Sequence, residues 1–134
     1  TPHARAATLR RFLVVDDNVD SAASQAQLLR MLGHDAETAN SGEEAMLKAA
    51  RFHPEVVLLD LGMPGMDGFA VARELRRMPE TSEATLIAQT GWGQDEDRQR
   101  TQEAGFDAHL AKPVELDALM ETLSRIAAPV ARLP

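Results

Sequence analysis

The feature that most constrains the fold is an alternation, repeated five times, between a short apolar run and a segment with helical periodicity. The clearest run is EVVLLD at 55–60, whose continuous apolar middle is typical of a strand buried on both faces of a sheet. The other expected strands cover 11–16, 34–39, 84–90 and 107–111, of which 34–39 has the weakest pattern. Short strands that alternate with helices favour a parallel sheet with helices on both faces.

The expected helices have recognisable patterns. In the second of them, Ser41 and Glu44 form a capping box, in which the hydroxyl and the carboxylate each satisfy a free backbone N–H. The segment at about 94–104 is polar apart from Ala104, which is typical of a solvated and weakly held helix. Helices are expected at about 19–32, 41–52, 68–78 and 94–104, and a last one carries five apolar residues on one face, Leu116, Leu119, Met120, Leu123 and Ile126.

Five strands and five helices of this kind predict a doubly wound α/β fold, (βα)5, with the flavodoxin-like strand order 2-1-3-4-5. In such open parallel sheets, sites lie outside the carboxyl ends of the strands, where the strand order reverses. For this order the reversal falls between the first and third strands. The strand ends carry Asp16 and Asp17, Asp60, Thr90 and Lys112. We therefore expect three carboxylates, a hydroxyl and an ammonium group at one edge of the sheet.

Each of these residues also has an ordinary structural interpretation. Asp17 could cap the first helix, Asp60 could be a turn residue, and Thr90 could be a β-branched strand residue. Lys112 could be a cation at a strand end that extends its ammonium group into water. Separate structural roles do not require a common location, so the coincidence of these residues at one edge favours a functional site.

The chemistry of this edge favours a hard metal ion and a phosphoryl group. Three clustered carboxylates repel one another, so one must be protonated unless a cation neutralises them. Oxygen ligands without His or Cys favour Mg²⁺ or Mn²⁺, and Mg²⁺ commonly binds together with phosphoryl oxygens. With a lysine and a hydroxyl beside one aspartate, transfer of a phosphoryl group to Asp60 would depend on positioning and on electrostatic stabilisation.

Composition disfavours several other classes of function. The formal net charge of −7 disfavours an electrostatic grip on nucleic acid. The chain has no cysteine, which excludes disulfides, thiol nucleophiles and thiolate metal sites, and its four histidines show no metal-ligand spacing. No apolar run approaches the roughly 20 residues that a membrane span needs, so we expect no membrane insertion.

Four ordered motifs carry a specific resemblance. LVVDDN, VVLLDLGMPGMDG, QTG and AHLAKP closely resemble the marks of the receiver domain of two-component response regulators, the CheY-like family. The resemblance covers about 11–127, with a linker or leader at 1–10 and a tail at 128–134. The 134 residues have room for one domain. The resemblance implies a cytoplasmic phosphoacceptor domain that promotes its own phosphorylation and dephosphorylation, rather than an enzyme.

The resemblance also implies roles for the acids. Asp60 would be the phosphoacceptor, and Mg²⁺ or Mn²⁺ would be held by Asp16, Asp17, Asp60 and the main-chain carbonyl of Gly62. Gly62 carries no side chain that could screen the phosphoryl group. We therefore expect an open site, in which hydrolysis of the phosphoryl group is not markedly slower than in a Gly62→Glu variant.

The remaining motif residues would form the switch. Thr90 would supply the hydroxyl that follows the phosphoryl group, and Lys112 would pair with the phosphoryl oxygens. Pro113 would follow a cis peptide bond that aims the lysine. Gly91 and Trp92 would support the loop after Thr90, where the tryptophan is either a local apolar plug or part of the switch, and both could hold.

His109 departs from the family, which usually has Tyr or Phe at this place. That aromatic ring rotates inward as the switch hydroxyl moves, so the usual read-out is in doubt here. The histidine is either a half-buried packing residue or a pH-sensitive switch. In the family, a face that corresponds here to 94–127 changes on phosphorylation and meets the downstream partner.

The resemblance implies a histidine kinase or a histidine phosphotransfer protein as phosphodonor. The stretch at 90–115 and the Ala/Arg-rich leader resemble receivers at the carboxyl end of hybrid sensor histidine kinases, and a stand-alone receiver is the alternative parent. An aspartyl-phosphate phosphatase is disfavoured because Gly62 stands where such enzymes usually have a second aspartate. A pseudo-receiver that binds partners without phosphorylation is disfavoured because the site is complete.

Overall fold

The computed structural model describes residues 9–62, 67–91 and 98–127. They form one parallel sheet of five strands in the order β2-β1-β3-β4-β5. The predicted fold class and strand order are therefore confirmed. The strands are β1 (Arg11–Val15), β2 (Asp35–Ala39), β3 (Val56–Asp60), β4 (Thr85–Thr90) and β5 (Ala108–Ala111).

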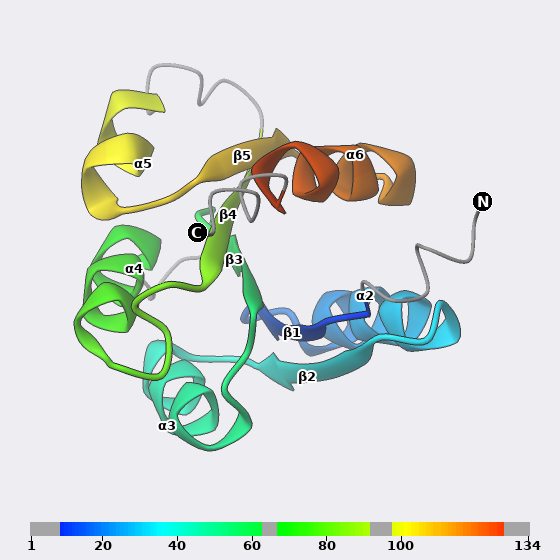
Figure 1. Cartoon of the computed structure of the whole chain (residues 1–134), viewed down its shortest axis with the longest axis horizontal. Coiled ribbons are helices and arrows are strands. Elements are labelled where there is room, and N and C mark those ends of the chain that lie inside the picture. Colours follow the sequence, from blue (N-terminus) through cyan, green and yellow to red (C-terminus); the bar gives the residue numbers. More distant parts are fainter. Residues whose placement is uncertain (1–8, 63–66, 92–97, 128–134) are drawn as a thin grey trace, which may run out of the picture.

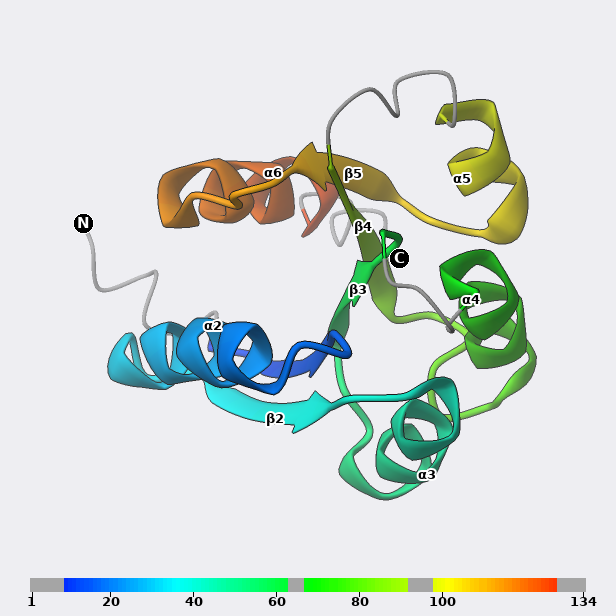
Figure 2. The same cartoon turned by 180° about the vertical axis from the view of Figure 1, so that it is seen from behind.

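Helices cover both faces of this sheet (Figure 1). Helices α2 and α6 lie on one face, and α3, α4 and α5 lie on the other, as the view from behind also shows (Figure 2). Across the described residues, each helix falls short of the length and apolar character that a membrane crossing requires. The helices are α2 (Val19–Met31), α3 (Gly42–Phe52), α4 (Gly68–Arg77), α5 (Arg98–Ala104) and α6 (Leu116–Ala127).

The strands divide the core into two layers because successive side chains point to opposite faces of a sheet. Leu59 and Leu86 belong to the cluster under α3 and α4, whereas Leu58 and Ile87 belong to the cluster under α2 and α6. All four side chains are fully buried. A continuous apolar run is therefore needed in β3 and β4, as the sequence pattern indicated.

The capping box of α3 forms with one change. Ser41 Oγ accepts from Glu44 N at 3.0 Å, as predicted. The Glu44 carboxylate, however, accepts from Asn40 N at 2.7 Å, one residue before the cap. This backbone hydrogen bond is the main cause of a lowered pKa of Glu44. Two backbone donors near the helix start are still satisfied, which is the physical purpose of the motif.

One expectation about helix faces is wrong in part. The segment expected to be polar and weakly held is described only from Arg98 onward, and there Thr101 and Ala104 are buried. A threonine can serve as a core residue through its methyl group, so α5 has a buried side that its composition did not predict.

Candidate functional site

Three buried polar residues stand at the carboxyl ends of neighbouring strands, and two of them, Asp16 and Asp60, lie on either side of the reversal of strand order. Asp16 follows β1, Asp60 ends β3 and Thr90 ends β4. Each is exposed by 4% or less, which is rare for a carboxylate without a partner. The structure therefore brings these predicted residues to one edge of the sheet.

Lys112 joins the two buried acids at this edge. Its Nζ donates to Asp60 Oδ2 and lies 3.9 Å from Asp16 Oδ2. Its backbone N–H donates to Thr90 O at 2.7 Å, and the Lys112–Pro113 peptide bond is cis, as predicted. The lysine at the end of the fifth strand thus meets the acids of the first and third strands, which compensates their burial.

Backbone and amide donors fix the position of Asp16. Its Oδ1 accepts from Asn18 N at 2.9 Å, and its main-chain oxygen accepts from Asn40 Nδ2 at 2.7 Å. Burial raises the pKa of Asp16, and the nearby Asp60 charge raises it further, while the Asn18 N–H and Lys112 oppose this change. The environment therefore penalises the ionised form of Asp16 until more positive charge arrives.

The first residues after Asp60 are held by main-chain donors, and the Asp60 carboxylate itself is buried. Gly62 N donates to Asp60 Oδ1 at 2.8 Å and Leu61 N donates to Gln89 O at 2.9 Å, which together hold the loop. Gly62 is exposed, and a Cβ added there would stand 3.5 Å from Asp60 Oδ1, an ordinary contact. A side chain at residue 62 would therefore fit and could cover the carboxylate.

The donor atoms at this edge fit a hard divalent cation. Among the described residues, Asp16 and Asp60 supply buried carboxylate oxygens at the two strand ends, and such oxygens are the ligands that a hard divalent cation prefers. Asp17 is exposed, and within the described ranges no group of three acidic or histidine side chains is arranged to hold a metal ion. Asp17 and the Gly62 carbonyl therefore remain predicted ligands.

The other predicted residues that the structure describes are His109, Gly91 and Pro113. His109 is half-buried on β5 and lines a hollow of about 320 Å³ together with Thr101 and Phe106. A Cβ added at Gly91 would meet nothing within 4 Å, so there is open space beside that residue. Pro113 is exposed. Trp92 lies outside the described residues.

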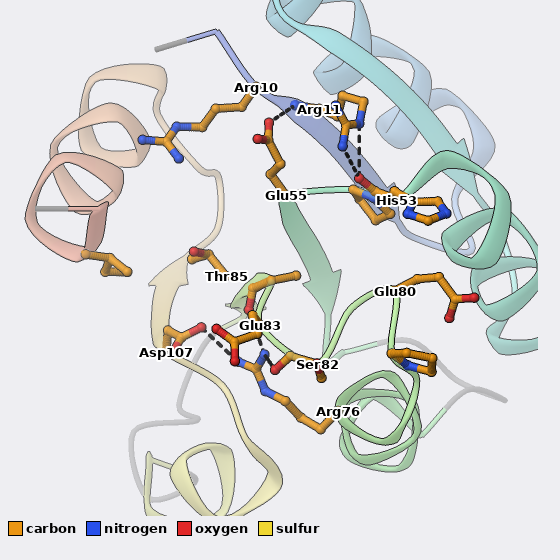
Figure 3. Close-up of a pocket in the computed structure, with 14 residues that line it drawn as sticks. Arg10, Arg11, His53, Glu55, Arg76, Glu80, Ser82, Glu83, Thr85 and Asp107 are labelled. Carbon is orange, nitrogen blue, oxygen red and sulfur yellow. Dashed lines mark hydrogen bonds and ion pairs between the residues drawn. The ribbon is translucent and has the colours of Figure 1, made fainter. Parts of the chain in front are cut away.

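A separate hollow of about 630 Å³ lies at the opposite, amino end of the sheet (Figure 3). Arg11 reaches His53 O at 2.8 Å, and Arg76 donates to Gly105 O at 2.7 Å and to Asp107 Oδ2 at 2.9 Å. These guanidinium groups bond to the protein's own carbonyl and carboxylate oxygens. Their arrangement ties loops together and is best explained as structural.

One polar residue near the site was missed from sequence. Gln89 is 3% exposed in β4, and its Nε2 donates to Gln25 Oε1 on α2 at 3.1 Å. The signal was a single amide in the otherwise apolar run ATLIAQT before Thr90. A buried amide needs a partner, but the sequence alone could not identify which residue supplies it.

Comparisons with known proteins extend these observations. A family model described as "Response regulator receiver domain" matches residues 12–124. The sensor histidine kinase RcsC of Escherichia coli K12 is 37% identical over 112 residues, which are 84% of this chain but 12% of that protein. Protein PilH of Pseudomonas aeruginosa is 32% identical over 120 residues, which are 90% of this chain and 99% of PilH.

Solved structures show the same similarity. The crystal structure of a CheY-like response regulator receiver domain protein from Methanospirillum hungatei JF-1 superposes with a TM-score of 0.81 at 26% identity. The superposition covers 93% of this chain and 98% of that one. The shared architecture therefore includes nearly the entire described part of the chain.

Proposed function

This chain belongs to the response regulator receiver domain family, and from that premise we propose that Asp60 accepts the phosphoryl group. The observation that supports this assignment most directly is the buried Asp60 carboxylate, paired with Lys112 and next to Asp16, at the reversal of strand order. A carboxylate held in this way is a suitable nucleophile for phosphoryl transfer, which depends mainly on positioning and charge stabilisation.

In the proposed reaction an oxygen of Asp60 forms the new bond to phosphorus. The bond from phosphorus to the donor breaks, and its electron pair leaves with the donor. Lys112 exchanges part of its contact with the Asp60 carboxylate for a phosphoryl oxygen, and the Thr90 hydroxyl donates to another. Asp16, Asp17, Asp60 and the Gly62 carbonyl would hold Mg²⁺ or Mn²⁺, which would supply positive charge beside the phosphoryl oxygens.

The phosphodonor is a histidine kinase or a histidine phosphotransfer protein. Both carry the phosphoryl group on an imidazole nitrogen, and the absence of a side chain at Gly62 favours approach of a phosphohistidine past that residue. The domain works in the cytoplasm, binds no nucleic acid itself and meets its downstream partner through the 94–127 face. The net charge of −7 supports the absence of nucleic-acid binding.

The parent protein is a hybrid sensor histidine kinase. The 37% identity to RcsC supports this, while the full-length match to PilH supports a stand-alone receiver as the alternative. An antibody raised against this domain distinguishes them in the source cells. A band several times longer than 134 residues supports the hybrid kinase, and a band of about this length supports the stand-alone receiver.

Stoichiometry separates the receiver from a phosphatase. With Mg²⁺ and a small acyl phosphate, phosphate release should be slow and limited by the lifetime of one phosphoryl group per chain. An aspartyl-phosphate phosphatase would instead turn over many general phosphate esters rapidly. Rapid multiple turnover on such esters would contradict the proposed function. Failure to acquire any phosphoryl group would favour a pseudo-receiver.

A further inference from the structure

Gln89 is a polar residue at a buried position of β4. The residues before it, Leu86, Ile87 and Ala88, are apolar and fully buried, and Gln89 itself is 3% exposed. An amide buried without a hydrogen-bond partner destabilises a fold. Gln25 supplies that partner from α2, 64 residues away in the sequence. The two side chains therefore form a fixed link between β4 and α2.

The main chain of Gln89 contacts the strand end that carries Asp60. Its carbonyl accepts from Leu61 N at 2.9 Å, and Leu61 stands between Asp60 and Gly62. Its Cα is also paired in register with that of Asp60 across the β3–β4 ladder. The position of the Asp60 carboxylate and of the loop after it thus depends on the residue that carries the buried amide.

Helix α2 positions the other carboxylate, that of Asp16. Asn18 caps this helix through its side chain, which accepts from Ser21 N at 2.9 Å. The backbone N–H of the same Asn18 donates to Asp16 Oδ1 at 2.9 Å. A helix is a rigid element, so a shift of α2 relative to the sheet moves Asn18 and with it the Asp16 carboxylate.

We propose that the Gln25–Gln89 hydrogen bond is a positioning contact that sets the separation of the Asp16 and Asp60 carboxylates, and thereby the affinity of the site for a divalent cation. Gln89 bonds to the β3 side through its main chain and to α2 through its side chain. Mg²⁺ demands near-ideal ligand geometry, so small changes of carboxylate separation alter its affinity. The inference rests on the proposed metal site.

Leucine substitutions separate positioning from ordinary packing. In Q25L the Gln89 amide keeps its burial but loses its partner, so stability falls. In the double variant Q25L/Q89L both polar groups are gone, and an apolar pair of similar size recovers most of the stability. If the pair only filled space, Mg²⁺ affinity would recover with stability. A positioning contact predicts that Mg²⁺ affinity stays weak in both variants.

The test measures Mg²⁺ binding by titration calorimetry and stability by urea unfolding, on the whole chain. The variants are Q25L, Q89L, the double variant and Q27L, which removes an exposed amide from the same helix. We expect the Mg²⁺ dissociation constant to rise about two- to tenfold in the first three, the range set by one hydrogen bond. We expect no change in Q27L.

Wild-type Mg²⁺ affinity in the double variant, or an equal loss in Q27L, would overturn the inference. If Q89L does not fold, Q25L and the double variant still decide it. Two measurements on the wild-type chain distinguish failure of this inference from failure of the proposed function. A wild-type chain that binds Mg²⁺ but accepts no phosphoryl group contradicts the function alone, whereas a wild-type chain that binds no Mg²⁺ contradicts both.

Discussion

The Asp16 carboxyl group is buried beside Asp60, and both acids form ion pairs with Lys112. A raised pKa means that ionising Asp16 is harder in the folded chain than in the unfolded one. This cost is present above the folded pKa and disappears as the pH falls below the ordinary value of 3.8. At neutral pH the ionised Asp16 carboxylate therefore costs stability, and a cation bound beside it would offset this cost.

Asp16→Asn should raise the free energy of unfolding at pH 7 without Mg²⁺, because the penalised charge is gone and Oδ1 still accepts from Asn18 N. Mg²⁺ at about 100 times its dissociation constant should stabilise the wild type by about 2.7 kcal/mol and the variant much less. Urea unfolding with and without Mg²⁺ measures both effects. Equal stabilisation of the two proteins by Mg²⁺ would show that Asp16 is no ligand.

Gly62→Glu should lengthen the lifetime of the aspartyl phosphate severalfold. A side chain fits at this position, since its Cβ would stand 3.5 Å from Asp60 Oδ1, and a glutamate there would screen the phosphoryl group from water. Phosphate release after removal of the donor gives the two lifetimes. A phosphoryl group that is lost markedly more slowly from the wild type than from the variant would contradict an open site.

His34 provides a prediction at the amino end of the sheet. Its Nδ1 accepts from Arg10 N at 3.1 Å, and burial, followed by the Arg10 charge, lowers its pKa from 6.5. The unfolded chain therefore takes up a proton first, and stability is lost as the pH falls below 6.5. His34→Asn keeps an acceptor but does not titrate, so its stability should fall less on acidification. Identical pH profiles from urea unfolding at a series of pH values would rule this out.

Among the elements, α4 is tied to its neighbours by one side chain. Arg76 donates to the carbonyls of Gly105 and Ala84, at 2.7 and 2.6 Å, and pairs with Asp107. Asp107 Oδ2 also accepts from Leu86 N at 2.9 Å. A single guanidinium group thus connects α4, the start of β4 and the turn between α5 and β5.

Arg76→Met should lower the free energy of unfolding by about 2–3 kcal/mol, because it leaves several partly buried oxygens without their donor. Arg77→Met is the matched control. Arg77 is exposed and pairs with the exposed Glu74, so its loss should cost under ~0.5 kcal/mol. Urea unfolding of both variants checks this contrast. Similar losses in the two would mean that the Arg76 contacts contribute no specific stability.

The positions of the strands could be predicted from the sequence, whereas the contacts between distant elements could not. Strands β3 and β4 could be placed because burial on both faces leaves a continuous apolar run, and their last residues then locate Asp60 and Thr90. The bonds from Gln89 to Gln25 and from Arg76 to Gly105 could not be placed, because they join residues 64 and 29 positions apart. Such contacts follow from how α2 and α4 pack on the sheet, which local patterns do not encode.

In the whole molecule, the two ends of the sheet differ in role: one carries the candidate site, and the other carries structural contacts. The carboxyl end gathers Asp16, Asp60 and Lys112, whereas the amino end carries the hollow where Arg11 and Arg76 bond to the protein's own oxygens. Chemistry at one end can therefore change without loss of the contacts that stabilise the other.

The most direct test of the central claim is the intact mass of the chain after incubation with Mg²⁺ and a small acyl phosphate, with Asp60→Asn measured alongside. The proposed function predicts one added phosphoryl group on the wild type, lost again with time, and none on the variant. Omission of Mg²⁺ should also abolish the adduct. A wild-type chain that gains no phosphoryl group, or a variant that gains one equally, would contradict the assignment of Asp60 as phosphoacceptor.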